Sequence, residues 1–87
     1  MEEKIDKDLV DQMNKEENQL IRVIIQTYDG CKEEEDRKMV KSVGGEYLFD
    51  LPIIGGFAAK LPKTGIKLLA LNKRVKKIFY DKPISLK

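Results

Sequence analysis

The sequence predicts an α+β domain with the element order βαββαβ, preceded by an N-terminal helical extension. Two observations support this prediction. Runs rich in β-branched and aromatic residues alternate with segments in which apolar residues recur at helical spacing. Glycine and proline separate these segments, at the points where one element is expected to end and the next to begin.

The first expected strand, over residues 20–27, is the clearest element. It is apolar on both faces apart from Arg22 and Gln26, which indicates a place in the middle of a sheet. The expected helix over 32–43 follows, because acidic residues gather at its start and lysines lie nearer its end. Gly44-Gly45 then ends the helix, since glycine readily takes the positive φ of a helix exit.

In the second half of the chain, proline and glycine again separate the expected strands and helix. Pro52 ends one strand and Gly55-Gly56 marks a turn into the next strand. Pro62 opens a second helix whose Ile66, Leu69 and Ala70 are expected to face inward. The expected elements are strands over 46–51 and 57–61, a helix over 63–71 and a last strand over 74–80.

The N-terminal segment differs from the rest in charge. Residues 1–18 hold seven acidic residues and three lysines, whereas the whole chain carries a net charge of +2. Four apolar residues in this segment recur at helical spacing: Ile5, Leu9, Val10 and Met13. This helix is either a solvated extension, or its apolar side docks on the domain or on a partner helix. We therefore divide the chain into an extension (1–19), a domain (20–82) and a C-terminal tail (83–87).

The order βαββαβ is that of the ferredoxin-like arrangement. Right-handed crossovers place both helices on one face of a four-stranded antiparallel sheet. The other face then has no cover within the chain, and an exposed apolar face indicates a partner. The candidates for that face are Ile24, Leu48, Ala58 and either Phe79 or Tyr80.

Composition excludes several classes of function. The chain has no histidine, so it cannot form a Ser-His-Asp triad or a His-ligated zinc site. Its single cysteine, Cys31, cannot form an internal disulfide or a multi-cysteine metal cluster. No apolar run approaches the ~20 residues of a membrane span, and Met1-Glu2-Glu3-Lys4 does not begin a signal peptide. We therefore expect no enzyme activity, no catalytic residue, no metal or other cofactor and no membrane partner.

Four segments of the chain, taken in order, resemble a known family. Together they fall within about 67 of the 87 residues, from Ile21 to Lys87. The segments are Ile21-Arg22-Val23-Ile24-Ile25, Val40-Lys41-Ser42-Val43-Gly44-Gly45, Ile53-Ile54-Gly55-Gly56-Phe57-Ala58-Ala59-Lys60-Leu61-Pro62, and Val75-Lys76-Lys77-Ile78 with Asp81. Their order and spacing resemble the propeptides of subtilisin-like serine proteases.

The resemblance implies a function. Propeptides of this family act as intramolecular chaperones for their protease and inhibit it after autocleavage. It implies that a sheet face with Leu48, Ala58 and Phe79 packs on two protease helices and that Asp81 caps a helix of the protease. It also implies a precursor that is secreted, a cognate subtilisin-like protease as partner, and a propeptide that is monomeric alone. The tail would lie in the protease cleft as a cleaved product, through Ile84, Ser85, Leu86 and Lys87.

Two positions depart from the family pattern. Phe79 stands where a first acidic cap residue is expected, two residues before Asp81. Lys87 would occupy the S1 pocket, which in many subtilisins favours large apolar or aromatic groups.

Other functions share the expected fold. The main alternative is a stand-alone regulatory or protein-interaction module. An RNA-binding domain would need aromatic residues on adjacent central strands, and the strand over 20–27 has none, so no nucleic-acid partner is expected. An enzyme of the acylphosphatase type would need an arginine-containing phosphate loop, where this chain has Tyr28-Asp29-Gly30.

Overall fold

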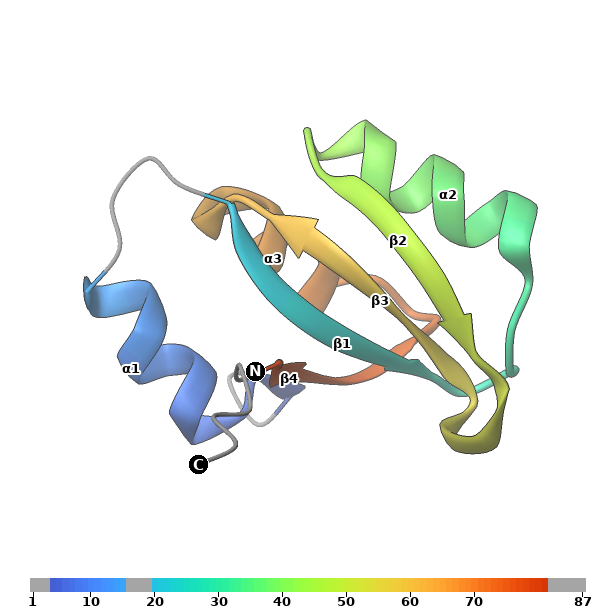
Figure 1. Cartoon of the computed structure of the whole chain (residues 1–87), viewed down its shortest axis with the longest axis horizontal. Helices are drawn as coiled ribbons and strands as arrows, with labels where there is room; N and C mark the ends of the chain where they lie inside the picture. Colours follow the sequence, from blue (N-terminus) through green and yellow to red (C-terminus); the bar gives the residue numbers. More distant parts are fainter. Residues whose placement is uncertain (1–3, 16–19, 82–87) are drawn as a thin grey trace, which may run out of the picture.

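The computed structural model describes residues 4–15 and 20–81 (Figure 1). Every strand and helix expected from residue 20 onward is present, and each boundary lies within one residue of its predicted position. Within the described residues the elements are α1 (Lys7–Lys15), β1 (Ile21–Thr27), α2 (Glu33–Ser42), β2 (Glu46–Leu51), the 3-10 helix η2 (Pro52–Ile54), β3 (Gly56–Leu61), α3 (Lys63–Ala70) and β4 (Val75–Tyr80).

The four strands form one open antiparallel sheet in the order β2-β3-β1-β4. β1 pairs with β3 on one side and with β4 on the other, and β2 pairs with β3. The apolar strand β1 is therefore central, as its composition predicts. The protein is α+β: its described residues form a four-stranded antiparallel sheet, three α-helices and one 3-10 helix, and this is compatible with a ferredoxin-like arrangement.

The hydrophobic core lies between one face of the sheet and the helices. In β1 the core-facing residues alternate with more exposed ones, which is the pattern of a strand covered on one face. The helix α3 buries Ile66, Leu69 and Ala70, as their spacing predicts. The strand residues of the core are Ile21, Val23, Ile25, Phe57, Ala59, Leu61, Val75 and Ile78, and the residues from α2 and α3 are Met39, Val40, Ile66, Leu69 and Ala70.

The helix α1 belongs to the same core. Leu9 is fully buried and Met13 is nearly so, and both join the cluster formed by the sheet and the other helices. Just before this helix, Ile5 forms a parallel bridge with Ile78 of β4, and the Asp6 N–H donates to the Ile78 carbonyl at 2.9 Å. Of the two interpretations of the N-terminal stripe, docking on the domain is thus confirmed.

Two glycines have conformational or steric reasons for their positions. Gly44 follows α2 with φ 79°, the left-handed conformation that the sequence predicts for this helix exit. Gly56 begins β3 where the strand passes the backbone of β1. A Cβ atom at this position would collide with the Ile25 carbonyl oxygen and press on the Gln26 Cα. Only glycine allows this approach of the two strands.

Candidate functional site

The sheet face opposite the core carries a row of apolar side chains that crosses all four strands. The strand register places Phe49, Ala58, Ile24 and Phe79 next to one another, in that order from β2 to β4. Phe49 is 45% exposed, Ile24 and Phe79 are half-buried, and Ala58 is buried. None of the four belongs to the core under the helices. We call this set the open-face row.

A β-bulge in β2 determines which residue completes the row. The register shifts between Tyr47, which pairs with Ala59, and Phe49, which pairs with Ala58. Leu48 is the extra residue, and it is half-buried. The sequence predicts Leu48 for the open face, whereas the residue of β2 that pairs with Ala58 there is Phe49.

Ring contacts on the two faces agree with this register. The Arg37 guanidinium of α2 lies 4.5 Å from the centroid of the Tyr47 ring, so Tyr47 faces the helices. The Arg22 guanidinium lies 5.8 Å from the centroid of the Phe49 ring. Arg22 alternates with the buried Ile21 and Val23, so Phe49 is on the open face. No pattern in the sequence marks the extra residue, and sequence reasoning therefore missed Phe49.

Charged residues lie beside the open-face row. Arg22 pairs with Lys60 of β3, and the Asp81 N–H donates to the Arg22 carbonyl at 3.1 Å. The Arg22 Nε also donates to Asp81 Oδ2 at 2.6 Å. On the other flank, the Lys77 ammonium is 5.4 Å from the centroid of the Phe79 ring. An apolar centre with a polar rim is the usual composition of a protein–protein interface.

The structure thus brings together most of the predicted sheet-face residues. Ala58 and Phe79 are in the row, and Asp81 lies at the end of β4 beside it, in an ion pair with Arg22. Leu48 adjoins the row at the bulge. The tail residues Ile84, Ser85, Leu86 and Lys87 lie outside the described part of the chain.

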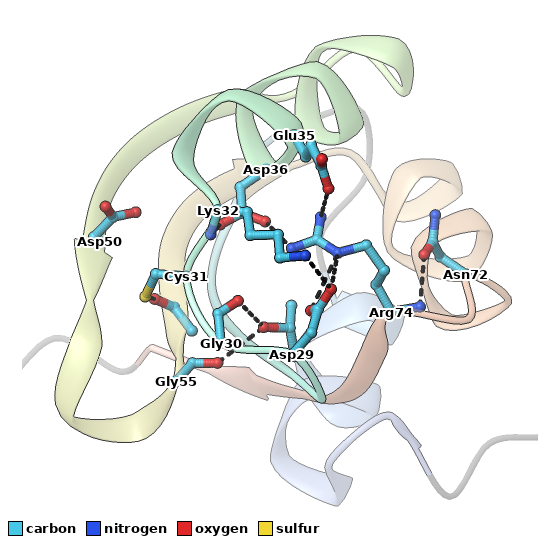
Figure 2. A network of polar contacts seen from close by, with 12 residues as sticks. Asp29, Gly30, Cys31, Lys32, Glu35, Asp36, Asp50, Gly55, Asn72 and Arg74 are labelled. Atoms are coloured by element: carbon cyan, nitrogen blue, oxygen red, sulfur yellow. Dashed lines mark hydrogen bonds and ion pairs between the residues drawn. The ribbon is translucent and has the colours of Figure 1, made fainter.

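A second polar cluster lies on the helix side of the sheet, around Arg74 (Figure 2). Arg74 precedes β4, and its Nη2 lies 2.9 Å from Asp36 Oδ1 at the start of α2. Its Nε donates to Asp29 Oδ2 at 3.1 Å. Asp36 is fully buried, and its Oδ2 accepts the Lys32 backbone N–H at 3.2 Å. The contact between Arg74 and Asp36 is an ion pair without hydrogen-bond geometry.

Burial and contacts within the cluster shift the pKa values of its members in different directions. The hydrogen bond from Arg74 lowers the pKa of Asp29. Burial raises the pKa of Asp36, although the Lys32 N–H and Arg74 oppose that rise. Burial alone would lower the pKa of Arg74, but its contacts with the Asp29 and Asp36 carboxylates outweigh burial and raise it. The carboxylates of Asp29 and Asp36 thus contact the same guanidinium. The cluster therefore has a structural role, and we call these three residues the Arg74 clamp.

Cys31, which adjoins the cluster, is not an activated thiol. Its Sγ donates to the Gly56 carbonyl at 3.1 Å. Burial raises the pKa of this thiol, and the nearby Asp50 carboxylate raises it further. A cysteine nucleophile requires the thiolate, which both effects disfavour.

The described residues also show no arrangement typical of a metal site or of a membrane span. Within 4–15 and 20–81, no group of three or more His, Cys, Asp or Glu side chains is arranged to hold a metal ion. None of the helices in these ranges is both long and apolar enough to span a membrane. The chain matches no protein-family model, and no curated protein matches it significantly.

Proposed function

We propose that this protein is a propeptide-type domain that assists the folding of a subtilisin-like serine protease and then inhibits it. The proposal includes a ferredoxin-like βαββαβ fold in which α2 and α3 cover one sheet face and the protease covers the other. The observation that carries it is the open-face row of Phe49, Ala58, Ile24 and Phe79 with its charged flanks. A sheet of this kind, apolar on the side away from its helices, needs a partner to cover it.

The position of the row relative to Asp81 supports this partner. β4 carries Phe79, and Asp81 follows directly beside Arg22. Asp81, the last described residue, therefore lies at the rim of the proposed contact surface. In the proposal residues 82–87 continue from that rim into the protease cleft, where an extended peptide adds to the cleft edges and its side chains fill alternating pockets.

In the proposed complex, Asp81 accepts N–H groups at the N-terminus of a protease helix. A carboxylate there satisfies donors that have no partner within their helix, and the helix dipole favours its charge. Arg22 acts as a positioning residue, because its bond of 2.6 Å fixes the carboxylate at the end of the sheet. This pair takes the place of the two acidic caps that the family pattern places two residues apart.

Inhibition of a panel of subtilisin-like proteases tests the proposal. We expect the full chain to inhibit at least one of them. Phe79→Ser should weaken inhibition, by less than the ~1.5–3 kcal/mol of a fully buried aromatic side chain, because Phe79 is already half-buried in the free domain. The matched control is Tyr28→Ser, because Tyr28 is 67% exposed and lies at a turn outside the row. Equal loss in both variants would argue against the row as the contact surface.

The tail has its own test within the same assay. Removing residues 84–87 should weaken inhibition by orders of magnitude and leave the fold intact. Ile84→Gly should weaken it through lost apolar burial in the S4 pocket. Lys87→Tyr should strengthen inhibition of proteases with apolar S1 pockets and weaken it for acidic ones. If the truncated and full chains inhibit a susceptible protease equally, the tail is not the inhibitory element.

The proposed setting is a secreted protease precursor from which the domain is released by autocleavage. Refolding of the denatured cognate protease, with and without the domain, tests the chaperone role. Failure of the whole protease panel, together with a stable and monomeric domain, would instead favour the regulatory or protein-interaction module.

A further inference from the structure

The helix side of the molecule contains a cleft between α1 and α3, away from the open face of the sheet. Its volume is about 510 Å³, within the range of small-molecule sites. The α1 side is lined by Val10 and Met13, with Ile5 just before the helix. The α3 side presents Lys63 and Lys67, followed by apolar residues up to Leu71. Among the described residues, no acidic one lines the cleft.

The two helices run in opposite directions along the cleft. The Lys4 ammonium, just before α1, donates to the Asn72 carbonyl just after α3, at 3.1 Å. The start of α1 therefore lies at the end of α3. Ile5 and Leu71 are thus at one end of the cleft, and Lys63 is at the other.

This arrangement gives the cleft a gradient of polarity. One end is apolar, and Leu71 there is 74% exposed, so a ligand could cover it. Toward the opposite end stand Lys63 and Lys67, one helical turn apart on the same face of α3. Neither lysine side chain has an ion pair or hydrogen bond to another residue in the described part of the chain.

We propose that this cleft binds an amphiphilic anion, an acyl chain with a carboxylate head. The acyl chain would cover Leu71, Ile5 and the apolar side of α1, while Lys63 and Lys67 bind the carboxylate. The eight residues of α3 extend about 12 Å, which suits an acyl chain of medium length. The inference does not depend on the proposed function, because the cleft and the open-face row are on different sides of the sheet.

Other occupants fit the cleft less well. A second copy placed symmetrically would bring the two pairs of lysines toward each other, and like charges across an interface are costly. A folded protein partner would need roughly 800 Å² of surface on each side, which requires many more residues than the eight that line the cleft.

Titration of the isotopically labelled full chain with decanoate, below the micelle concentration, tests the proposal by NMR. We expect saturable shifts confined to residues of the cleft. Lys63→Gln combined with Lys67→Gln should weaken decanoate binding roughly tenfold. Lys41→Gln combined with Lys76→Gln makes the same change in net charge on exposed residues outside the cleft, and should leave the affinity unchanged.

Ligands of different head charge complete the test. Decanol should bind more weakly than decanoate to the wild type, and equally to the wild type and to the Lys63/Lys67 variant. The proposal is overturned by an absence of saturable shifts, by equal decanoate affinity in both double variants, or by equally tight binding of decyltrimethylammonium. It is also overturned if dilution alone produces the same shifts, because a second copy would then occupy the cleft.

Discussion

The guanidinium of Arg74 and the carboxylate of Asp36 meet at 2.9 Å and join the turn before β4 to the first turn of α2. Asp36 is fully buried, so its charge has left water and depends on this partner. The same guanidinium also donates a hydrogen bond to Asp29, in the turn that follows β1. One side chain thus connects three segments that are far apart in the sequence.

Arg74→Ala should therefore destabilise the protein strongly. Removing one partner of a buried ion pair costs about 3–5 kcal/mol, and partial exposure of Arg74 places the expected loss near the lower limit, about 3 kcal/mol. Urea unfolding followed by circular dichroism measures it. The matched control is Arg37→Ala, which removes an exposed pair with Glu33 and a ring contact and should cost about 1 kcal/mol or less. Similar losses in both variants would contradict the Arg74 clamp.

The lowered pKa of Asp29 predicts a loss of stability in acid. Its ordinary pKa is 3.8, and the hydrogen bond from Arg74 lowers the folded value. The unfolded chain then takes up a proton first, so this contribution is full above pH 3.8 and is lost as pH falls through the folded pKa. Unfolding free energies of wild type and Asp29→Asn should converge as pH falls below 3.8. A constant difference across this range would contradict the prediction.

Asp36 should have the opposite dependence. Burial raises its folded pKa above 3.8, so the folded state binds the proton more readily than the unfolded chain. Its ionised form therefore costs stability, and this cost declines as pH falls through the raised pKa toward 3.8. Unfolding free energies of Asp36→Asn and wild type, measured over the same pH range, isolate this contribution. Its pH dependence should be opposite to that of Asp29.

The packing of α1 predicts that the N-terminal segment is needed for stability. Leu9→Ala empties a fully buried position and should cost about 2–5 kcal/mol. Asp11→Ala, on the exposed side of the same helix, should change stability by less than about 0.5 kcal/mol. Thermal unfolding of both variants gives the comparison. If Leu9→Ala unfolds at the wild-type temperature, α1 does not pack on the core in solution.

The close approach at Gly56 predicts a steric effect that composition alone would not suggest. Gly56→Ala places a Cβ against the Ile25 carbonyl oxygen, which belongs to the sheet backbone and cannot rotate away. We expect a loss above about 3 kcal/mol. Gly44→Ala meets nothing within 4 Å and should cost only about 1 kcal/mol, from its positive φ. Unfolding measurements in urea should preserve this order.

The sequence predicts the elements well because their local signals agree with the fold. Gly44-Gly45, Pro52 and Pro62 separate elements where the structure does, and β1 is central as its apolar composition predicts. Local patterns do not indicate the bulge at Leu48, since an extra residue changes the face without changing composition. The spacing of apolar residues also gives no information on polar pairs between distant parts of the sequence. The pairs Arg22–Asp81 and Arg74–Asp36 therefore could not be predicted.

The bridge between Ile5 and Ile78 has a consequence for the order of events in folding. Contacts between residues near opposite ends of a chain require the largest loop closure and tend to form slowly. During synthesis α1 is made before β4, the strand that follows it in the sequence and that Ile5 joins. Until β4 emerges, Leu9 and Met13 lack part of their packing surface, and the nascent chain exposes the apolar side of α1 to chaperones and proteases.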